Sequence, residues 1–283
     1  MRILFISLKK LFCFLPRRLS YVLVSFCAVA GYIFLNRQRN SVKRNIRHIL
    51  KTEDRRIISR TSRKMFVNFA KYLVDFFSAE KLTRSISSGL FDLREMEKID
   101  SVVSSGNGVI ILTAHLGNWE LGGGVVSLHG HTVHAVALPH ADPAVNEIFD
   151  NQRVNMNMSV ISTGAALKKC YSVLKQGKIL ALLGDRDFSG MGSRATMFSA
   201  DVSVPRGPAV LSAKFKVPIL PAFLLRTSGD RYRLCVDAPV YPVDDSGQLK
   251  SQEEIMQEYL SVIQRYLRDY PDQWYIFDDY FNI

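Results

Sequence analysis

The chain has 283 residues, 47% of them hydrophobic, and a formal charge of +11. This length predicts one domain, or one domain plus an appendage, with a sizeable core. The four cysteines are scattered and contain no C-x-x-C pair, which excludes a disulfide framework or a zinc site and is typical of a reducing compartment.

The positive charge is concentrated at the amino-terminal end. Residues 1–64 hold sixteen lysines and arginines but only two acids, Glu53 and Asp54, so the remainder of the chain is slightly acidic. A basic segment of this kind is expected to meet an anionic partner. We expect that partner to be an anionic membrane surface, and we expect no nucleic-acid partner.

The same end contains an uncharged apolar stretch, residues 19–35, with two arginines before it and two after it. Seventeen residues is about the lower limit for spanning a bilayer. We favour a membrane anchor over residues 1–40, with flanking arginines that attract anionic headgroups. Whether it spans the membrane or lies in it stays open. A signal peptide cleaved near 28–30 and a buried core helix are the alternatives.

Residues 41–283 are expected to form the main domain, with a helical lead-in over 41–105 and an α/β core over 106–283. The lead-in has apolar positions at helical spacing over 41–84, and a further helix is predicted over 91–105. In the core, strands and helices alternate, which predicts a mostly parallel sheet flanked by helices on both faces. The predicted strands are 108–112, 131–138, 158–162, 178–184, 217–226 and 232–240, and the predicted helices are 119–128, 142–154, 164–177, 207–216 and 251–271.

A histidine and a glutamate stand five residues apart in "LTAHLGNWELG", directly after the first predicted strand. On one continuous helix His115 and Glu120 would point roughly 140° apart. Gly117 permits a turn between them and Asn118 is suited to cap a new helix, so Glu120 could fold back toward His115. The pair would lie at the carboxyl end of a strand, where α/β sheets favour ligand sites.

A histidine and carboxylate pair suits general-base catalysis, because the carboxylate orients the imidazole and stabilises its protonated form. A single histidine at a strand end is more often structural, but the intervening glycine and asparagine favour the catalytic interpretation. The chain has no G-x-S-x-G motif. A hydroxyl on the substrate would therefore have to attack directly.

Further charged residues follow other predicted strands. Asp185, Arg186 and Asp187 come directly after a buried strand, where unpaired charges are costly. Arg206 precedes a predicted helix, where an anion held with the helix amides would offset its unfavourable position. A solvated turn and a plain salt bridge are the structural alternatives. Arg153, on an amphipathic helix, is the weakest candidate and is compatible with a surface role.

The segment "TAHLGNWELGG" resembles the H-x-x-x-x-[DE] motif of the glycerolipid acyltransferase superfamily. The chain is most similar to the bacterial lipid A biosynthesis acyltransferases, the lauroyl and myristoyl transferases, and to relatives that acylate phosphatidylinositol mannosides. The likeness covers nearly the whole chain and includes 184–188, 204–223 and the aromatic ending 270–281. Asp278 and Asp279 stand where that family usually has basic residues, and the E-G-T-R-S motif of glycerol-3-phosphate acyltransferases is absent.

The resemblance implies an O-acyltransferase that moves an acyl chain from acyl carrier protein or acyl-CoA to a hydroxyl of a lipid A-type glycolipid. It implies no metal and no cofactor, and a place on the cytoplasmic face of the inner membrane. Another phospholipid or glycolipid acceptor, a non-catalytic lipid-binding relative and an esterase are the alternatives. The resemblance assigns His115 as base and Glu120 as its partner. The expected substrate-binding residues are Asn118, Arg153, Asp185, Arg186, Asp187 and Arg206.

Overall fold

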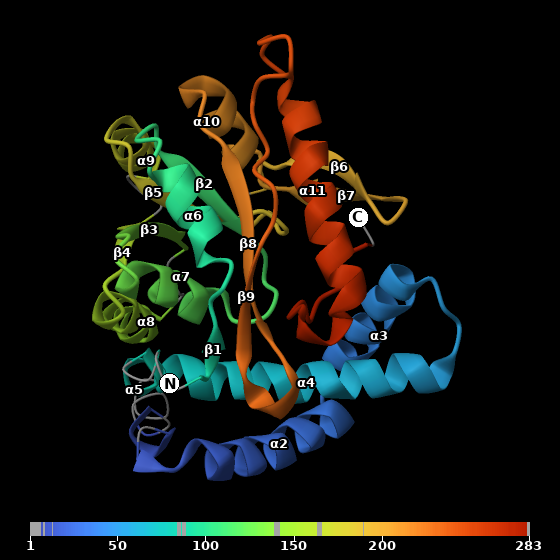
Figure 1. Cartoon of the computed structure of the whole chain (residues 1–283). Helices are drawn as coiled ribbons and strands as arrows, with labels where there is room; N and C mark the ends of the chain where they lie inside the picture. The colour runs from blue at the N-terminus through green and yellow to red at the C-terminus, as the bar shows by residue number, and fades with distance from the viewer. Residues whose placement is uncertain are drawn as a thin grey trace.

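The computed structural model shows a central sheet with helices on both faces and a helical layer below it (Figure 1). In the lower layer α4 runs across the molecule and α2 packs along it. The helices of this layer are α2 (Arg17–Phe34), α3 (Asn36–Leu50), α4 (Arg55–Phe77) and the short α5 (Ala79–Thr83). The structure describes residues 7, 9–12, 14–83, 86, 89–138, 142–162, 166–188 and 190–281.

Within the described residues the main sheet has seven strands in the order β1-β9-β8-β2-β5-β3-β4. Every neighbouring pair is parallel except β8 and β9, which are antiparallel. The prediction of a mostly parallel α/β sheet is therefore confirmed. The strands are β1 (Phe91–Asp92), β2 (Val109–Thr113), β3 (Val133–Ala137), β4 (Ser159–Ser162), β5 (Ile179–Leu183), β8 (Ile219–Arg226) and β9 (Tyr232–Val236).

Alternate residues of the central strands face two different cores, because successive side chains of a strand point to opposite faces. Ile110 and Leu112 pack with α9, α10 and α11, whereas Val109 and Ile111 pack with α7 and the end of α4. The apolar runs seen in the sequence are thus strands buried on both sides. The covering helices are α6 (Met96–Val103), α7 (Trp119–Leu128), α8 (Pro143–Asn155), α9 (Ala166–Lys175), α10 (Gly207–Phe215) and α11 (Gln252–Asp269), with single turns η3 (Ser228–Asp230) and η4 (Pro271–Gln273).

Two parts of the predicted secondary structure differ from the structure. Residues 91–105, expected as one helix, begin as the edge strand β1, whose Phe91 pairs with Tyr232, and only then form α6. The hairpin of β6 (Ser193–Met197) and β7 (Ala200–Val204) was not predicted. Its turn places Phe198 and Ser199 at φ of 51° and 68°. Such angles are usually filled by Asn-Gly, so the sequence carried no hairpin signal.

Helix α2 is long and apolar enough to cross a membrane by length and composition. One side packs against the protein through Tyr21, Val24 and Ala28. Contacts cross the boundary predicted at residue 40, since Arg17 forms an ion pair with the buried Asp75 of α4 at 2.8 Å. The opposite side carries large exposed apolar side chains, namely Leu19, Val22, Leu23, Phe26, Ile33 and Phe34.

Candidate active site

The turn after β2 has the conformation expected from the sequence. Gly117 has φ of 67°, and a Cβ there would lie 2.3 Å from the carbonyl oxygen of Leu224, so only glycine fits. The side-chain oxygen of Asn118 accepts the backbone N–H of Leu121 at 3.0 Å and caps α7. This turn holds His115 at the carboxyl end of β2.

The carboxylate that holds His115 is Asp185, at the carboxyl end of the neighbouring strand β5. Because β2 and β5 are parallel and in register, with Thr113 opposite Leu183, the residues that follow them meet at one edge. His115 Nδ1 lies 2.9 Å from Asp185 Oδ1, and the backbone N–H of His115 donates to Oδ2 at 3.1 Å. The indole N–H of Trp274 donates to the same oxygen at 2.8 Å.

Asp185 is fully buried and remains an acceptor for all these donors. Burial pushes the pKa of its carboxyl upward, but His115 and the N–H group of Trp274 outweigh burial and hold that pKa below its usual range. Tyr280 adds support, since its hydroxyl donates to the backbone oxygen of Asp185 at 2.5 Å. The site therefore contains a fixed, ionised carboxylate directly behind the imidazole.

The imidazole of His115 remains open on its other side. Its side chain is 15% exposed, and Trp119 and Phe188 meet it edge-on at ring distances of 5.2 and 5.7 Å. No side chain of the described residues forms a hydrogen bond to Nε2. With Asp185 on Nδ1, the neutral ring carries its proton there and presents the Nε2 lone pair to the opening. This is the arrangement of a general base.

The structure does not show the predicted pairing of His115 with Glu120, because each of the two side chains has another partner. Both carboxylate oxygens of Glu120 are bound by Arg153, at 2.9 Å to Nε and 2.6 Å to Nη2, and both side chains are 8% exposed. The guanidinium of Arg153 also donates to Asp150 at 3.0 Å. The spacing of residues within one segment cannot show that α8 supplies an arginine that binds both oxygens of this carboxylate. The guanidinium of Arg153 is therefore largely shielded from solvent in this structure.

Asn118, which was predicted to bind substrate, forms hydrogen bonds within the protein in this structure. It is buried, and its side chain is committed to the structure, because Oδ1 caps α7 while Nδ2 donates to the hydroxyl of Tyr232 at 3.3 Å. Its role is to shape the turn that carries His115. The backbone N–H groups of Gly117 and Asn118 also have partners. They donate to the carbonyl oxygens of Gln273 and Leu224 at 2.9 and 2.8 Å.

Of the remaining predicted charges, Arg186 is linked to the histidine through Phe188, whose ring meets that of His115. It stacks on Phe188 at 4.5 Å and donates to Asp278 at 2.7 Å. Asp187 faces the loop that follows it, where its carboxylate accepts the N–H of Gly192 at 2.8 Å. Arg206 is exposed before α10 and forms no ion pair within the described residues.

A second buried charge cluster was missed by the sequence analysis. Asp75 of α4 is fully buried and binds Arg17 and Arg226, each at 2.8 Å, and the hydroxyl of Tyr232 at 2.5 Å. Asn118 donates to the hydroxyl of Tyr232, so this hydrogen bond links the cluster to the turn that carries His115. The available signal was a single carboxylate inside the apolar run "YLVDFF". Such a charge must find buried partners.

The chain is similar in sequence to known acyltransferases. The chain is 24% identical over 131 residues to the phosphatidylinositol mannoside acyltransferase of Mycobacterium tuberculosis, covering 44% of this chain and 41% of that protein. It is 20% identical over 200 residues to the protein of the same name from Mycolicibacterium smegmatis, covering 69% and 66%. It is 24% identical over 183 residues to the lipid A biosynthesis palmitoleoyltransferase of Escherichia coli, covering 62% and 59%.

The matched segments thus span between 41% and 66% of the length of these relatives. At the level of the family the match is much broader. The sequence pattern of the bacterial lipid A biosynthesis acyltransferases extends over residues 2–282. The chain belongs to the bacterial lipid A biosynthesis acyltransferase family.

Proposed function

We propose that the protein transfers an acyl chain from a thioester donor, acyl carrier protein or acyl-CoA, to a hydroxyl of a lipid A-type glycolipid. The observation that carries this proposal is the imidazole of His115, fixed at Nδ1 by the buried Asp185 and open at Nε2. Membership of an acyltransferase family supports the reaction type. Acylation of a phosphatidylinositol mannoside is the second candidate, favoured by the similarity to the mycobacterial proteins.

In the proposed reaction Nε2 of His115 takes the proton of the acceptor hydroxyl as its oxygen attacks the thioester carbonyl. The carbon–sulfur bond then breaks, the leaving thiolate takes the proton back from Nε2, and an ester and a free thiol result. Asp185 stabilises the imidazolium formed in between. The proposed catalytic pair is therefore His115 and Asp185, with Glu120 and Arg153 as a structural support.

The negative oxygen of the tetrahedral intermediate needs a hydrogen-bond donor. The amides of Gly117 and Asn118 already donate to protein carbonyls. Arg186 stands next to Phe188, whose ring meets the imidazole, and its present partner Asp278 is largely exposed. We assign Arg186 to an anionic group of the reactants, either this oxygen or a phosphate, which would take the place of Asp278.

Helix α2 would hold the protein at the cytoplasmic face of the inner membrane. One side of α2 is packed on α4 and tied to it through Arg17 and Asp75, while the other exposes apolar side chains. A helix with these two sides is suited to lie in the membrane interface rather than to cross the bilayer. The glycolipid acceptor would then reach the site within the membrane surface, and the donor would arrive from solution.

A thiol-release assay on the purified full-length protein tests the function. With an acyl thioester and a lipid A precursor, we expect thiol release that requires the acceptor, and an ester product detected by mass spectrometry. His115→Ala should lower the rate by about 10²–10⁴ because the general base is lost. Lys168→Ala, at an exposed position of α9, is the control variant. Near-normal turnover by His115→Ala would overturn the mechanism, and absence of acceptor-dependent release would favour a lipid-binding role.

A further inference from the structure

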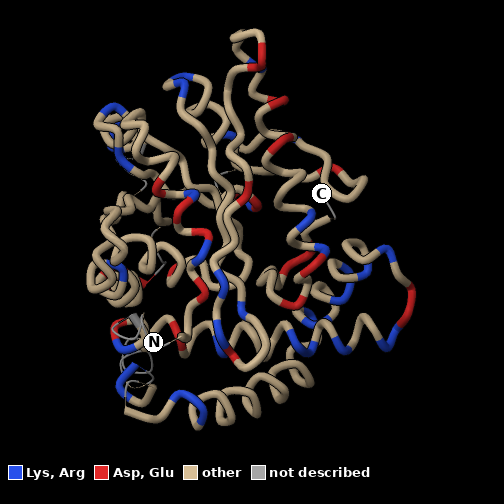
Figure 2. Tube along the Cα trace, viewed as in Figure 1, with Lys and Arg blue, Asp and Glu red and all other residues tan. Residues whose placement is uncertain are grey.

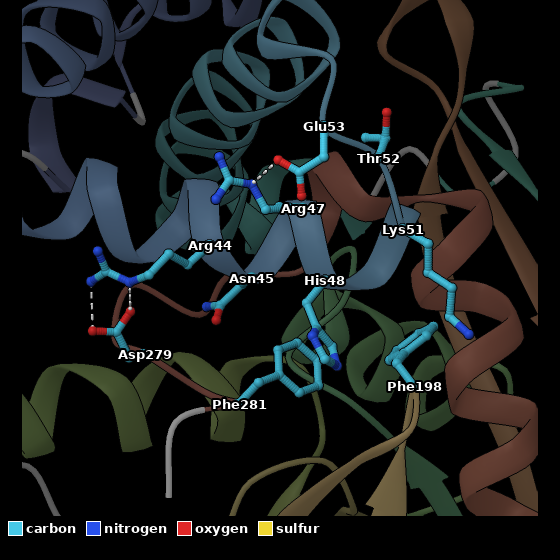
Figure 3. A pocket seen from close by; sticks show the side chains of 10 residues that line it. All are labelled: Arg44, Asn45, Arg47, His48, Lys51, Thr52, Glu53, Phe198, Asp279 and Phe281. Carbon is cyan, nitrogen blue, oxygen red and sulfur yellow. Dashed lines mark hydrogen bonds and ion pairs between the residues drawn. The ribbon is translucent and has the colours of Figure 1, made fainter.

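Two hollows open at the end of the molecule where α3 and α4 meet, and Arg44 and Arg47 line both. Figure 3 shows the first, of about 490 Å³, in which Arg47 pairs with Glu53 and Arg44 with Asp279. The second, of about 400 Å³, has no acid in its wall. We call it the α3–α4 groove, and its lining residues are Asn40, Lys43, Arg44, Arg47, Arg55, Ile58 and Ser59.

The groove brings four cationic side chains together. Arg44 and Arg47 are each paired with an acid of the first hollow, whereas Lys43 and Arg55 form no ion pair within the described residues. Lys43 and Arg47 are like charges at i and i+4 of α3, a spacing that destabilises a helix. Arg55 is the first residue of α4, where the helix dipole disfavours a cation. Figure 2 shows this end of the molecule as a concentration of basic residues. An anion between the helices would offset these repulsions, and guanidinium groups match phosphate oxygens in shape and charge.

The groove is continuous with the exposed apolar side of α2. Tyr32, near the end of α2, lies under Lys43 with the ammonium 5.7 Å from its ring, and its hydroxyl donates to the backbone oxygen of Ser59 at 3.3 Å. Both of these partners line the groove. The next two residues of α2, Ile33 and Phe34, are exposed. A cationic hollow and an apolar surface therefore share one boundary.

We propose that the α3–α4 groove binds the phosphate headgroup of an anionic membrane lipid whose acyl chains lie along the exposed side of α2. The apolar boundary favours a lipid over an acidic protein, because a lipid has acyl chains that can contact the neighbouring apolar residues, whereas an acidic side chain has none. The site is separate from acyl transfer, since none of the groove side chains bonds to His115 or Asp185 within the described part of the chain. It would fix the orientation of the protein on the membrane.

Vesicle binding by the full-length protein tests the proposal without any need for turnover, so its outcome is independent of the proposed reaction. Vesicles of phosphatidylcholine are compared with vesicles that also contain phosphatidylglycerol, by flotation. The groove variant is Lys43→Gln with Arg47→Gln. Two controls remove the same charge elsewhere, at exposed arginines of α4 outside the groove (Arg60→Gln with Arg63→Gln) and at exposed lysines of α9 (Lys168→Gln with Lys169→Gln).

We expect the groove variant to bind phosphatidylglycerol vesicles about 25-fold more weakly, since each basic residue at the surface contributes about fivefold. The two controls should lose clearly less, and binding to pure phosphatidylcholine should be equal in all proteins. If the Arg60 and Arg63 variant lost as much vesicle binding, the binding would come from diffuse surface charge and not from the groove, and the proposal would be overturned. Unchanged vesicle binding with weakened binding of acyl carrier protein would also overturn it. Circular dichroism of each variant establishes that it is folded.

Discussion

Two buried carboxylates at the active-site end of the molecule are satisfied in different ways. Asp185 is bound by His115, whose ring is 15% exposed and free at Nε2. Glu120 is bound by Arg153 through two hydrogen bonds, and both side chains are 8% exposed. The first pair is anchored on one side and open on the other, whereas the second pair is closed.

Only one of the two pairs can transfer a proton near neutral pH. An imidazole gains and loses a proton near neutral pH, whereas a guanidinium stays charged in proteins. The pair of Asp185 and His115 can therefore serve as a base. The pair of Glu120 and Arg153 joins the start of α7 to α8 and supports the histidine-bearing turn. We therefore assign separate roles to the histidine and the acid of the sequence motif, proton transfer to His115 and structural support to Glu120.

The largest expected effect is on kcat, which should differ between variants of the two carboxylates. Asp185→Asn should lower kcat by about 10²–10⁴, because an amide neither stabilises the imidazolium nor holds the productive tautomer. Glu120→Gln should lower kcat far less in the protein that remains folded. Steady-state kinetics on folded fractions of both variants measure this. A fully active Asp185→Asn beside an inactive Glu120→Gln would reverse our assignment.

The free energy of unfolding should show the opposite order, with a larger loss in Glu120→Gln than in Asp185→Asn. Glu120→Gln leaves the buried guanidinium of Arg153 without its main partner, and breaking a buried pair costs about 3–5 kcal/mol. The lower end applies here, because Asp150 still binds Arg153. Chemical denaturation in detergent is the measurement. The double variant Glu120→Gln with Arg153→Met removes the unpaired charge and should regain part of the loss. A single variant as stable as the parent would mean that the pair contributes nothing.

A smaller effect is expected from the side chains that cap α7 and α8. Asn118→Ala removes the cap of α7 and should cost about 1 kcal/mol of stability. Asp142→Ala removes the cap of α8 and should cost a similar amount. Only the change at Asn118 should also lower kcat, because that turn carries His115. Thermal denaturation and kinetics of the two variants measured together provide the check, and equal losses of rate would argue against a special role for the turn.

The smallest expected effect is on the stability of the protein at acidic pH. The folded pKa of Asp185 lies below its usual value of 3.8, so its ionised form stabilises the fold above that value. The contribution is lost as the pH falls from 3.8 through the folded pKa. We expect the stability difference between the parent and Asp185→Asn to narrow in that range. Melting temperatures at a series of pH values report it, and a constant difference down to the lowest pH would exclude Asp185 as the titrating group.

Local features of the chain were sufficient to predict the strand, turn and helix around His115. The apolar run of β2, the glycine that tolerates a positive φ and the asparagine that caps α7 all act within ten residues. The expectation of a parallel sheet rested on strand and helix alternation, which is also local. These parts of the fold could be predicted because the residues that determine them lie close together in the sequence.

The partner of each charge was decided only by the tertiary structure. Asp185 and Arg153 were both singled out in the sequence, but their partners lie 70 and 33 residues away, on other strands and helices. Asp75 meets Arg226 across 151 residues. A carboxylate accepts from whichever donor the packing brings to it, and residue spacing contains no information on that choice. From the sequence, His115 and Asp185 could be recognised as candidate site residues, whereas the packing of β5 and α8 against β2 and α7 determined which partner each charge has.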